Sequence, residues 1–490
     1  MSPATPTVSA ARTARLVGDV ARARPAYRAL ADALRLAVAD GRIAVGTRLP
    51  SERDLTHHLG LSRTTVTRAY DVLREAGYLA SRQGSGSVAT LPSGTHPRGT
   101  GGLFPADVAA NVVDLTCAAT RAPSGIVEAY ERAVEQLPAY LTGAGYLTFG
   151  VPELREAIAQ RYRDRGLPTS ADDVLVTSGA VAGLGVVARA LLRPGDRVVV
   201  EDPTYPNTLD GLRALGARLR AIPVDPDGWD VEESARTIGS ASARAAVLIP
   251  DFHNPTGALM ADEQRAALAH RLRAAGTTPV IDETVAEIDL EGGRSPLPFA
   301  AHSVDAISVG SSSKSHWGGL RTGWIRAPRG ALRALVESRV TSDLGAPVLE
   351  QLVLVELLRQ APALTAERRS DLVAARNALT AALREDLPEL RFRVPRGGLS
   401  LWCELPDGVG STALTAAAEA EGLLVASGPR FAVDGGLDRW IRIPHVLPPE
   451  TMTEAVARLA RAAHRVRSGR ASTGERGRRH TAGARRPLVA

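Results

Sequence analysis

Hydrophobic positions in the first part of the chain recur at the spacing of amphipathic helices. Tyr27–Ala39 has this spacing, and Ser51 and Ser62 each occupy an N-cap position before a further helical stretch. Tyr78–Val88 has strand character around a glycine-rich tip, which is typical of a β-hairpin. The third helix should bury Val66, Ala69, Tyr70 and Leu73. The pattern predicts an α+β module of three helices and a hairpin at residues 25–91.

Further along, short β-rich runs alternate with amphipathic helical stretches. The predicted helices include Ala180–Leu192 and Asp262–Ala275. The predicted strands are Val174–Thr177, Arg197–Glu201, Ala246–Pro250, Pro279–Asp282 and Ala306–Gly310. Alternation of this kind predicts an α/β domain with a mainly parallel central sheet, which we place at residues 113–466.

Three segments lack such patterns. We expect residues 1–24 to be a disordered N-terminus, and the Gly- and Pro-rich residues 92–112 to be a flexible linker. Residues 467–490, rich in Arg, Gly, Ala, Ser and Thr, should form a basic disordered tail.

Charge supports this division. Residues 22–91 hold 11 Arg against 6 acidic residues, and residues 465–490 hold 8 Arg against 1 Glu, although the whole chain carries only +6. Basic ends on an acidic body favour a nucleic-acid-binding module, although a basic tail is also typical of a solvated chain end. No signal-peptide pattern or membrane span is apparent, and two cysteines make neither a disulfide framework nor a metal cluster. We therefore expect a cytoplasmic protein without a metal site.

The outward face of the third predicted helix carries hydroxyls and cations near its N-terminus, which suits entry into the DNA major groove. A plain three-helix bundle with a polar surface would also show such a face. The run LPSERDL…LGLSRTTVTRAYDVLREAGYLASRQGSGS, however, resembles the winged helix-turn-helix of the GntR family. The resemblance implies DNA contacts at Arg53, Arg63, Thr64, Thr65, Thr67, Gln83 and Gly84. Arg48 and Arg68 are expected to contact phosphates.

Lys314 is the only lysine among 59 basic residues. An amine can lose its proton and attack a carbonyl, whereas a guanidinium stays charged. Serine hydroxyls precede Lys314 and Arg321 follows it by seven residues, and these are groups that hold a phosphate. The neighbourhood therefore predicts a Schiff base with pyridoxal 5′-phosphate (PLP).

Other candidate site residues follow predicted strands, at the sheet edge where α/β folds bind ligands. Ser178-Gly179-Ala180 begins a helix and offers free N–H groups to an anion. Tyr205 offers an aromatic face, Asn254 a donor to a phenolic oxygen, and Asp282 a carboxylate for a pyridine nitrogen. Taken singly, each could be an ordinary turn or packing residue.

Together the motifs TSGA, DPTYPN, HNPTG, IDE and SSSKSHWGGLRTGW resemble the fold type I, class I/II aminotransferases over Asp114–His464. The resemblance implies a PLP-dependent transferase fold with a small C-terminal α/β subdomain. It makes Lys314 the Schiff-base lysine and Arg442 the residue that binds the carboxylate of a substrate or effector, although Arg442 could instead be a surface strand residue. Tyr146 would reach the PLP phosphate of the partner subunit, which implies a homodimer. The remaining implied cofactor-binding residues are Ser178, Gly179, Ala180, Tyr205, Asn254, Asp282, Ser311 and Arg321.

Some positions depart from the family pattern. Thr284 and Val285 stand where many members have a tyrosine, and Val181-Ala182 replaces a frequent glutamine pair. Full transaminase turnover is therefore in doubt.

The order of the two domains resembles the MocR subfamily of GntR-family transcription regulators. This resemblance implies a regulator that binds operator DNA and senses PLP or an amino compound. The alternatives are an active aminotransferase with an accessory DNA-binding domain, and a DNA-binding scaffold with an empty cofactor site.

Overall fold

The computed structural model describes residues 7–468, except 19, 23, 40–42, 44–45, 83–85, 91–111 and 294. Contacts divide the chain into two compact units. The first comprises residues up to 102 together with Arg121–Glu131, and the second comprises the rest. The division thus assigns Arg121–Glu131, which we had placed in the large domain, to the N-terminal unit. The predicted linker up to residue 111 and the tail from residue 469 lie outside the described residues.

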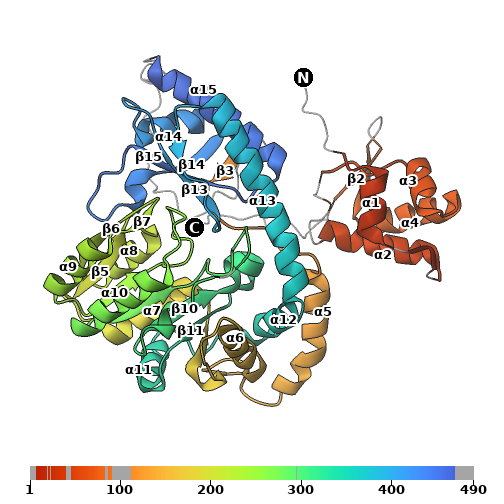
Figure 1. The fold of residues 1–490 in the computed structure, drawn as a ribbon. Coiled ribbons are helices and arrows are strands. Elements are labelled where there is room, and N and C mark those ends of the chain that lie inside the picture. The colour runs from red at the N-terminus through yellow and green to blue at the C-terminus, as the bar shows by residue number, and fades with distance from the viewer. Residues whose placement is uncertain are drawn as a thin grey trace, which may run out of the picture. The chain divides into compact units, whose positions relative to one another are not determined.

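The N-terminal unit contains the predicted three helices and hairpin (Figure 1). They are α2 (Ala26–Ala39), α3 (Glu52–Leu59), α4 (Arg63–Glu75), β1 (Leu79–Arg82) and β2 (Gly86–Ala89). Both predicted N-caps form, since Ser51 Oγ accepts from the Asp54 amide and Ser62 Oγ from the Thr65 amide, each at 3.1 Å. The four side chains predicted to face inward from α4 are all buried.

One expectation about this unit is wrong: residues 1–24 are not disordered throughout. Helix α1 (Ala10–Val17) and the short 3₁₀ turn η1 (Val20–Arg22) precede α2. Ser9 Oγ caps α1 by accepting from the Arg12 amide at 3.2 Å, and Val17 and Val20 are buried in the core of the unit. The buried residues of the helix are Ala10, Thr13 and Val17, so its inner face carries a single large apolar side chain, and packing of that face stabilises so short a helix.

The second unit is built around an eight-stranded sheet in the order β4-β11-β10-β9-β8-β5-β6-β7. The five predicted strands are confirmed as β4 (Val174–Thr177), β5 (Arg197–Asp202), β8 (Ala245–Leu248), β9 (Thr278–Asp282) and β10 (Ile307–Ser311). The others are β6 (Arg218–Asp225), β7 (Gly228–Trp229) and β11 (Gly323–Arg326). Strands β10, β9, β8, β5 and β6 are parallel, whereas β11 and β7 run antiparallel to their neighbours. The sheet is therefore mixed.

Helices surround this sheet in Figure 1. They are α6 (Pro152–Asp164), α7 (Ala180–Leu191), α8 (Pro206–Ala214), α9 (Val231–Ala241), α10 (Asp262–Ala274), α11 (Arg329–Arg339) and α12 (Val348–Arg359). Helix α5 (Ile126–Gln136) is divided between the two units. Short turns η2 (Leu137–Tyr140), η3 (Ala171–Asp173) and η4 (Phe299–Ala301) connect some of them.

A smaller C-terminal subdomain follows the long helix α13 (Ala361–Asp386), as Figure 1 shows. Its sheet has the order β12-β13-β15-β14-β3. The strands are β3 (Val113–Leu115), β12 (Arg391–Phe392), β13 (Ser400–Glu404), β14 (Leu423–Ser427) and β15 (Trp440–Pro444), covered by α14 (Ser411–Ala420) and α15 (Pro449–Arg467). Strand β3, more than 300 residues away from β14 in sequence, pairs with it in parallel.

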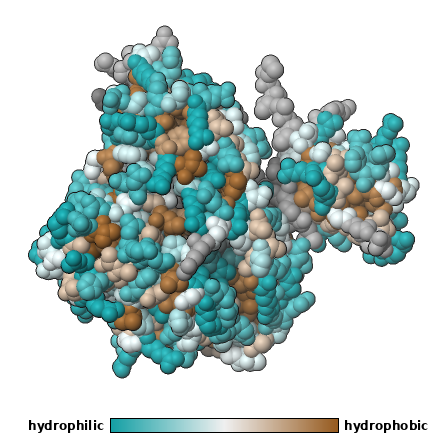
Figure 2. All heavy atoms as spheres, in the orientation of Figure 1, coloured by the Kyte–Doolittle hydropathy of each residue, from teal (hydrophilic) through white to brown (hydrophobic). Residues whose placement is uncertain are grey.

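Hydrophobic residues on the face shown in Figure 2 form small separate groups among hydrophilic ones. Within the described part of the chain, no helix combines the length and the apolar character needed to cross a membrane.

Candidate cofactor and nucleic-acid sites

A cavity of about 140 Å³ brings together most of the predicted cofactor residues. The predicted residues that line it are Ala180, Tyr205, Asn254, Asp282, Ser311, Lys314 and Arg321. They come from β9, β10, α7 and the segments after β5, β8 and β10. Segments distant in sequence therefore meet at one edge of the sheet.

Lys314 lies in a single π-helical turn, η5 (Ser313–Trp317), directly after β10. Burial lowers the pKa of its amine from 10.5 to about 8, because the low-dielectric surroundings disfavour the charged form. The neutral amine is the form that attacks a carbonyl. The site thus activates the one lysine of the chain.

Ser178 to Ala180 and Arg321 form an anion cradle. Gly179 is the N-cap of α7 with φ of 98°, a conformation that favours glycine. A Cβ atom at Gly179 would lie 2.8 Å from Arg321 Nη2, and that nitrogen donates to the Ser178 carbonyl at 3.3 Å. Ser311 Oγ donates to Ser313 Oγ at 3.0 Å close by. A helix N-terminus, hydroxyls and a guanidinium together suit a phosphate.

Tyr205 and Asp282 provide the groups expected around an aromatic ring. The Tyr205 hydroxyl accepts from Asn207 Nδ2 at 2.7 Å, and burial raises its pKa to about 12, so it stays neutral. Asp282 is buried and accepts from the Thr284 amide at 2.9 Å. Burial raises the pKa of Asp282, and a cationic ring nitrogen facing it would offset that effect.

Arg442, on β15, is fully buried, which excludes the alternative of a surface strand arginine. Its Nη1 donates to Asn254 Oδ1 at 3.2 Å and its Nη2 to the Thr116 carbonyl at 2.6 Å, whereas its Nε has no partner. Burial lowers the pKa of Arg442 to about 10. A buried cation held only by neutral acceptors is suited to binding a carboxylate.

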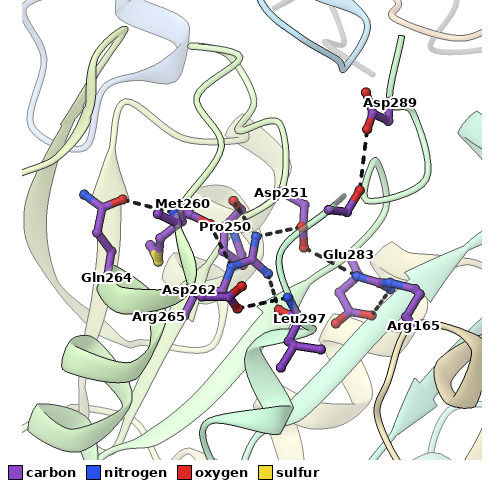
Figure 3. A network of polar contacts seen from close by, with 12 residues as sticks. Arg165, Pro250, Asp251, Met260, Asp262, Gln264, Arg265, Glu283, Asp289 and Leu297 are labelled. Atoms are coloured by element: carbon purple, nitrogen blue, oxygen red, sulfur yellow. Dashed lines mark hydrogen bonds and ion pairs between the residues drawn. The ribbon is translucent and has the colours of Figure 1, made fainter. Parts of the chain in front are cut away.

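A buried ionic network supports the segments that carry Asn254 and Asp282 (Figure 3). Arg265 of α10 donates to Asp251 Oδ1 at 2.8 Å and to the Met260 carbonyl at 2.9 Å. Arg165 lies 3.9 Å from Asp251 Oδ2 and 3.4 Å from Glu283 Oε2. The network joins the residue that follows Asp282 to the loop before Asn254, and so fixes both in place.

Several residues of the site escaped the sequence reasoning. Ala118, Phe252 and Leu399 line the cavity, and Phe252 has φ of 45°, which is rare for a bulky residue. Cys117 is close enough to affect the charges of Lys314, Arg442 and Tyr205. None of these residues belongs to a polar motif, so no signal in the sequence distinguishes them. Tyr146 does not line the cavity and is 68% exposed.

The predicted DNA-binding residues have different environments within their unit. Arg48, Arg53, Arg63 and Thr64 are exposed. Thr65 Oγ1 hydrogen bonds with the cap Ser62 at 2.8 Å, and Thr67 donates to Glu52 Oε2 at 2.6 Å. The Arg68 guanidinium lies 4.3 Å from the centre of the Tyr27 ring. Gln83 and Gly84 lie outside the described residues.

Comparison with known proteins finds a family match for each of the two parts of the chain. Residues 115–459 match the model of aminotransferase class I and II, and residues 26–88 match that of the bacterial regulatory proteins of the gntR family. The chain belongs to the aminotransferase class I and II family and carries a GntR-family domain at its N-terminal end. This combination is that of the GntR/MocR-type transcription regulators, and the fold is that of a PLP-dependent aminotransferase of fold type I.

Individual relatives agree with this assignment. The "Uncharacterized HTH-type transcriptional regulator YdcR" of Escherichia coli (strain K12) is 29% identical over 85% of this chain and 94% of its own length. The "Probable rhizopine catabolism regulatory protein MocR" of Rhizobium meliloti is 32% identical over 62% of this chain and 66% of its own. The crystal structure of LysN, an α-aminoadipate aminotransferase from Thermus thermophilus complexed with N-(5′-phosphopyridoxyl)-L-leucine, has a TM-score of 0.68 and 28% identity, covering 73% of this chain and 94% of LysN.

Proposed function

We propose that this GntR/MocR-type regulator binds PLP at Lys314 and changes its affinity for operator DNA when the cofactor, or an amino compound that reacts with it, is bound. One observation carries the proposal. The single lysine of the chain lies in a cavity lined by Arg321 and the buried carboxylate of Asp282, with buried Arg442 hydrogen bonded to Asn254 on the lining, and the pKa of the lysine is lowered to about 8.

The residues present fit the cofactor. Lys314 would hold its aldehyde carbon, Asp282 its ring nitrogen and Asn254 its phenolic oxygen. Tyr205 would stack on its ring. Ser178, Gly179, Ala180, Ser311 and Arg321 would hold its phosphate, and Arg442 the carboxylate of an amino-acid effector. When bound, PLP supplies an electrophilic aldehyde and an electron-withdrawing ring.

The N-terminal unit would place Arg53, Arg63 and Thr64 in contact with DNA. Because Thr67 and Thr65 are engaged within their unit, their contribution would be mainly to fix α4. A ligand at Lys314 can alter DNA affinity only if it binds one arrangement of the protein more tightly than another.

We also propose a homodimer, in which Tyr146 would reach the partner subunit's cofactor phosphate. Exposed apolar residues in the same part of the chain support this: Leu141 is 67% exposed, Phe149 40% and Leu344 46%. The segments carrying them are adjacent, since a Cβ atom at Gly345 would lie 3.1 Å from the Leu147 carbonyl oxygen. Sedimentation equilibrium tests the dimer, and a monomer at micromolar concentration would contradict it.

Two variants test the main proposal. Arg63→Ala should weaken binding to the upstream promoter fragment in a gel-shift assay and leave the visible absorbance of bound PLP unchanged. Lys314→Ala should remove that absorbance while the N-terminal unit still folds and still binds DNA without response to PLP. Loss of both properties in either variant would show that the two functions are not divided between the units as proposed.

The alternative is an active aminotransferase, and the complete set of Lys314, Asp282 and Arg442 favours it enough to require a test. Thr284 and Val285 stand where many aminotransferases have a tyrosine, so one hydrogen bond to the phenolic oxygen of the cofactor would be missing. Multiple-turnover conversion of amino acids with a keto-acid acceptor distinguishes the two. Sustained rates on the order of 1 s⁻¹ or more would establish the enzyme.

A further inference from the structure

One side of the cavity wall, among the residues not assigned to the cofactor, is apolar. Ala118, Phe252, Val285 and Leu399 come from four segments and all line the cavity. Ala118 and Leu399 are buried members of one hydrophobic cluster with Ile288, Leu290 and Leu372, and Val285 packs against that cluster. This side of the cavity is therefore continuous with buried hydrocarbon.

Phe252 closes this wall. A Cβ atom at Gly397 would lie 2.4 Å from Phe252 Cε1, and one at Gly398 would lie 3.2 Å from Phe252 Cβ. The two glycines thus leave the space that the ring occupies. Phe252 is 3% exposed, so its ring forms a buried apolar part of this wall.

The charged side chains that line the cavity already have partners in the proposed site. Apart from His253, they are Asp282, Lys314 and Arg321. In the proposed site Lys314 binds the PLP aldehyde and Arg321 the PLP phosphate. Arg442, just beyond the lining, binds one carboxylate of the effector. His253 is buried, with Nδ1 3.0 Å from Thr256 Oγ1 and Nε2 3.3 Å from Glu201.

Two uncharged polar residues on the lining, Thr284 and Ser313, are also engaged, and Ser400 adds a hydroxyl without a charge. The Thr284 amide donates to Asp282, and Ser313 is hydrogen bonded to Ser311 through both its amide and its hydroxyl. The lining thus offers no cation to a second carboxylate. Such a carboxylate would lose its hydration against hydrocarbon without an ionic partner, whereas an alkyl or aromatic group would gain from burial there.

We infer that the effector is an α-amino acid with one carboxylate and an uncharged, apolar side chain, which would lie against Ala118, Phe252, Val285 and Leu399. The inference rests on the proposed function, because it assumes that Lys314 holds PLP and Arg442 binds the carboxylate of the effector. The cavity would thus select effectors by the polarity of their side chain.

The test uses three amino acids of nearly equal shape. L-leucine, L-asparagine and L-aspartate all branch at Cγ into two heavy atoms, and only aspartate carries a second negative charge. Each is titrated into the full-length protein loaded with PLP, and the change in visible absorbance gives an apparent Kd. Isoamylamine, which is leucine without its carboxylate, measures the contribution of Arg442.

We expect leucine to bind at least about tenfold more tightly than aspartate, with asparagine between them, and isoamylamine to bind more weakly than leucine. Val285→Arg should reverse the order of leucine and aspartate, because it places a cation at the half-buried edge of the apolar wall. Val304→Arg, at a residue that is 69% exposed and absent from the lining, is the matched control and should leave the order unchanged.

Aspartate binding as tightly as leucine in the unmodified protein would overturn the inference. So would the absence of any spectral response to all four compounds, while PLP-dependent DNA binding, which tests the proposed function, persisted. If PLP itself failed to bind at Lys314, the proposed function and this inference would both be wrong.

Discussion

The lowered pKa of Lys314 gives a prediction that the composition of the chain makes easy to measure. Reagents such as trinitrobenzenesulfonate modify only neutral amines, and Lys314 is the one side-chain amine present. Burial in the cavity lowers the pKa of Lys314 from 10.5 to about 8. This shift corresponds to roughly 3 kcal/mol in favour of the neutral form.

The expected rate of modification follows from that value. At pH 7 roughly a tenth of a lysine with a pKa near 8 is neutral, against roughly one in three thousand for an ordinary lysine. The neutral fraction rises with pH. In the protein without PLP, the rate of modification at position 314 should therefore rise with pH and reach half its maximum near pH 8. Unfolding in denaturant should return the midpoint to the ordinary range. Mass spectrometry of the Lys314 peptide separates this signal from the N-terminal amine.

A variant identifies the cause of the shift. Burial contributes most, and the Arg442 cation lowers the pKa further, so Arg442→Gln should move the midpoint upward. Arg333→Gln, whose side chain is 90% exposed, is the control and should not move it. A midpoint above about pH 10 in the folded wild-type protein would refute the reasoning, because it would mean that the amine is solvated.

Three further results are expected. Gly323→Ala should weaken PLP binding at least about tenfold in an absorbance titration, because the added Cβ would lie 2.6 Å from the Gly179 carbonyl carbon. Gly330→Ala is the control and should leave PLP binding unchanged, because an added Cβ there has nothing within 4 Å. Asp251→Asn should lower the free energy of unfolding by roughly 3–5 kcal/mol in chemical denaturation, because it removes the carboxylate partner of buried Arg265. The control is Asp227→Asn, at a side chain that is 90% exposed, and an equal effect of the two variants would contradict the role of the network. Of the two thiols, partly exposed Cys117 should react with Ellman's reagent, and PLP should protect it. Cys403 should not react, because burial raises its pKa. Equal reactivity of the two thiols, or no protection of Cys117 by PLP, would contradict the placement of Cys117.

Much of the fold was predictable because its signals are local. The caps at Ser51 and Ser62 and the five β-rich runs correspond to elements in the structure. Helix α1 was missed because its buried residues include only one large apolar side chain, Val17, which packs against residues distant in sequence. Strands β11 and β7 were not predicted. Strand β11 pairs antiparallel with β4, which is distant in sequence, whereas β7 forms a short local hairpin with β6.

The candidate site divides in the same way. Motif residues such as Asn254 and Asp282 could be named because each follows a strand and carries a functional group. Ala118 and Leu399 could not, because an apolar residue that lines a cavity has the same sequence signature as one in the core. The burial of Arg442 also required the structure, since a single arginine on a strand is compatible with either environment.

The hydrogen bond from Arg442 to the Thr116 carbonyl has a mechanical consequence. Thr116 immediately follows β3, the first strand of the second unit, and β3 lies against β14, which itself pairs with the strand that carries Arg442. The guanidinium that would bind an incoming carboxylate is thus hydrogen bonded to the backbone three residues after Val113, the first residue of β3. A displacement of Arg442 would therefore act directly on the backbone at Thr116, beside the strand with which the described part of the second unit begins.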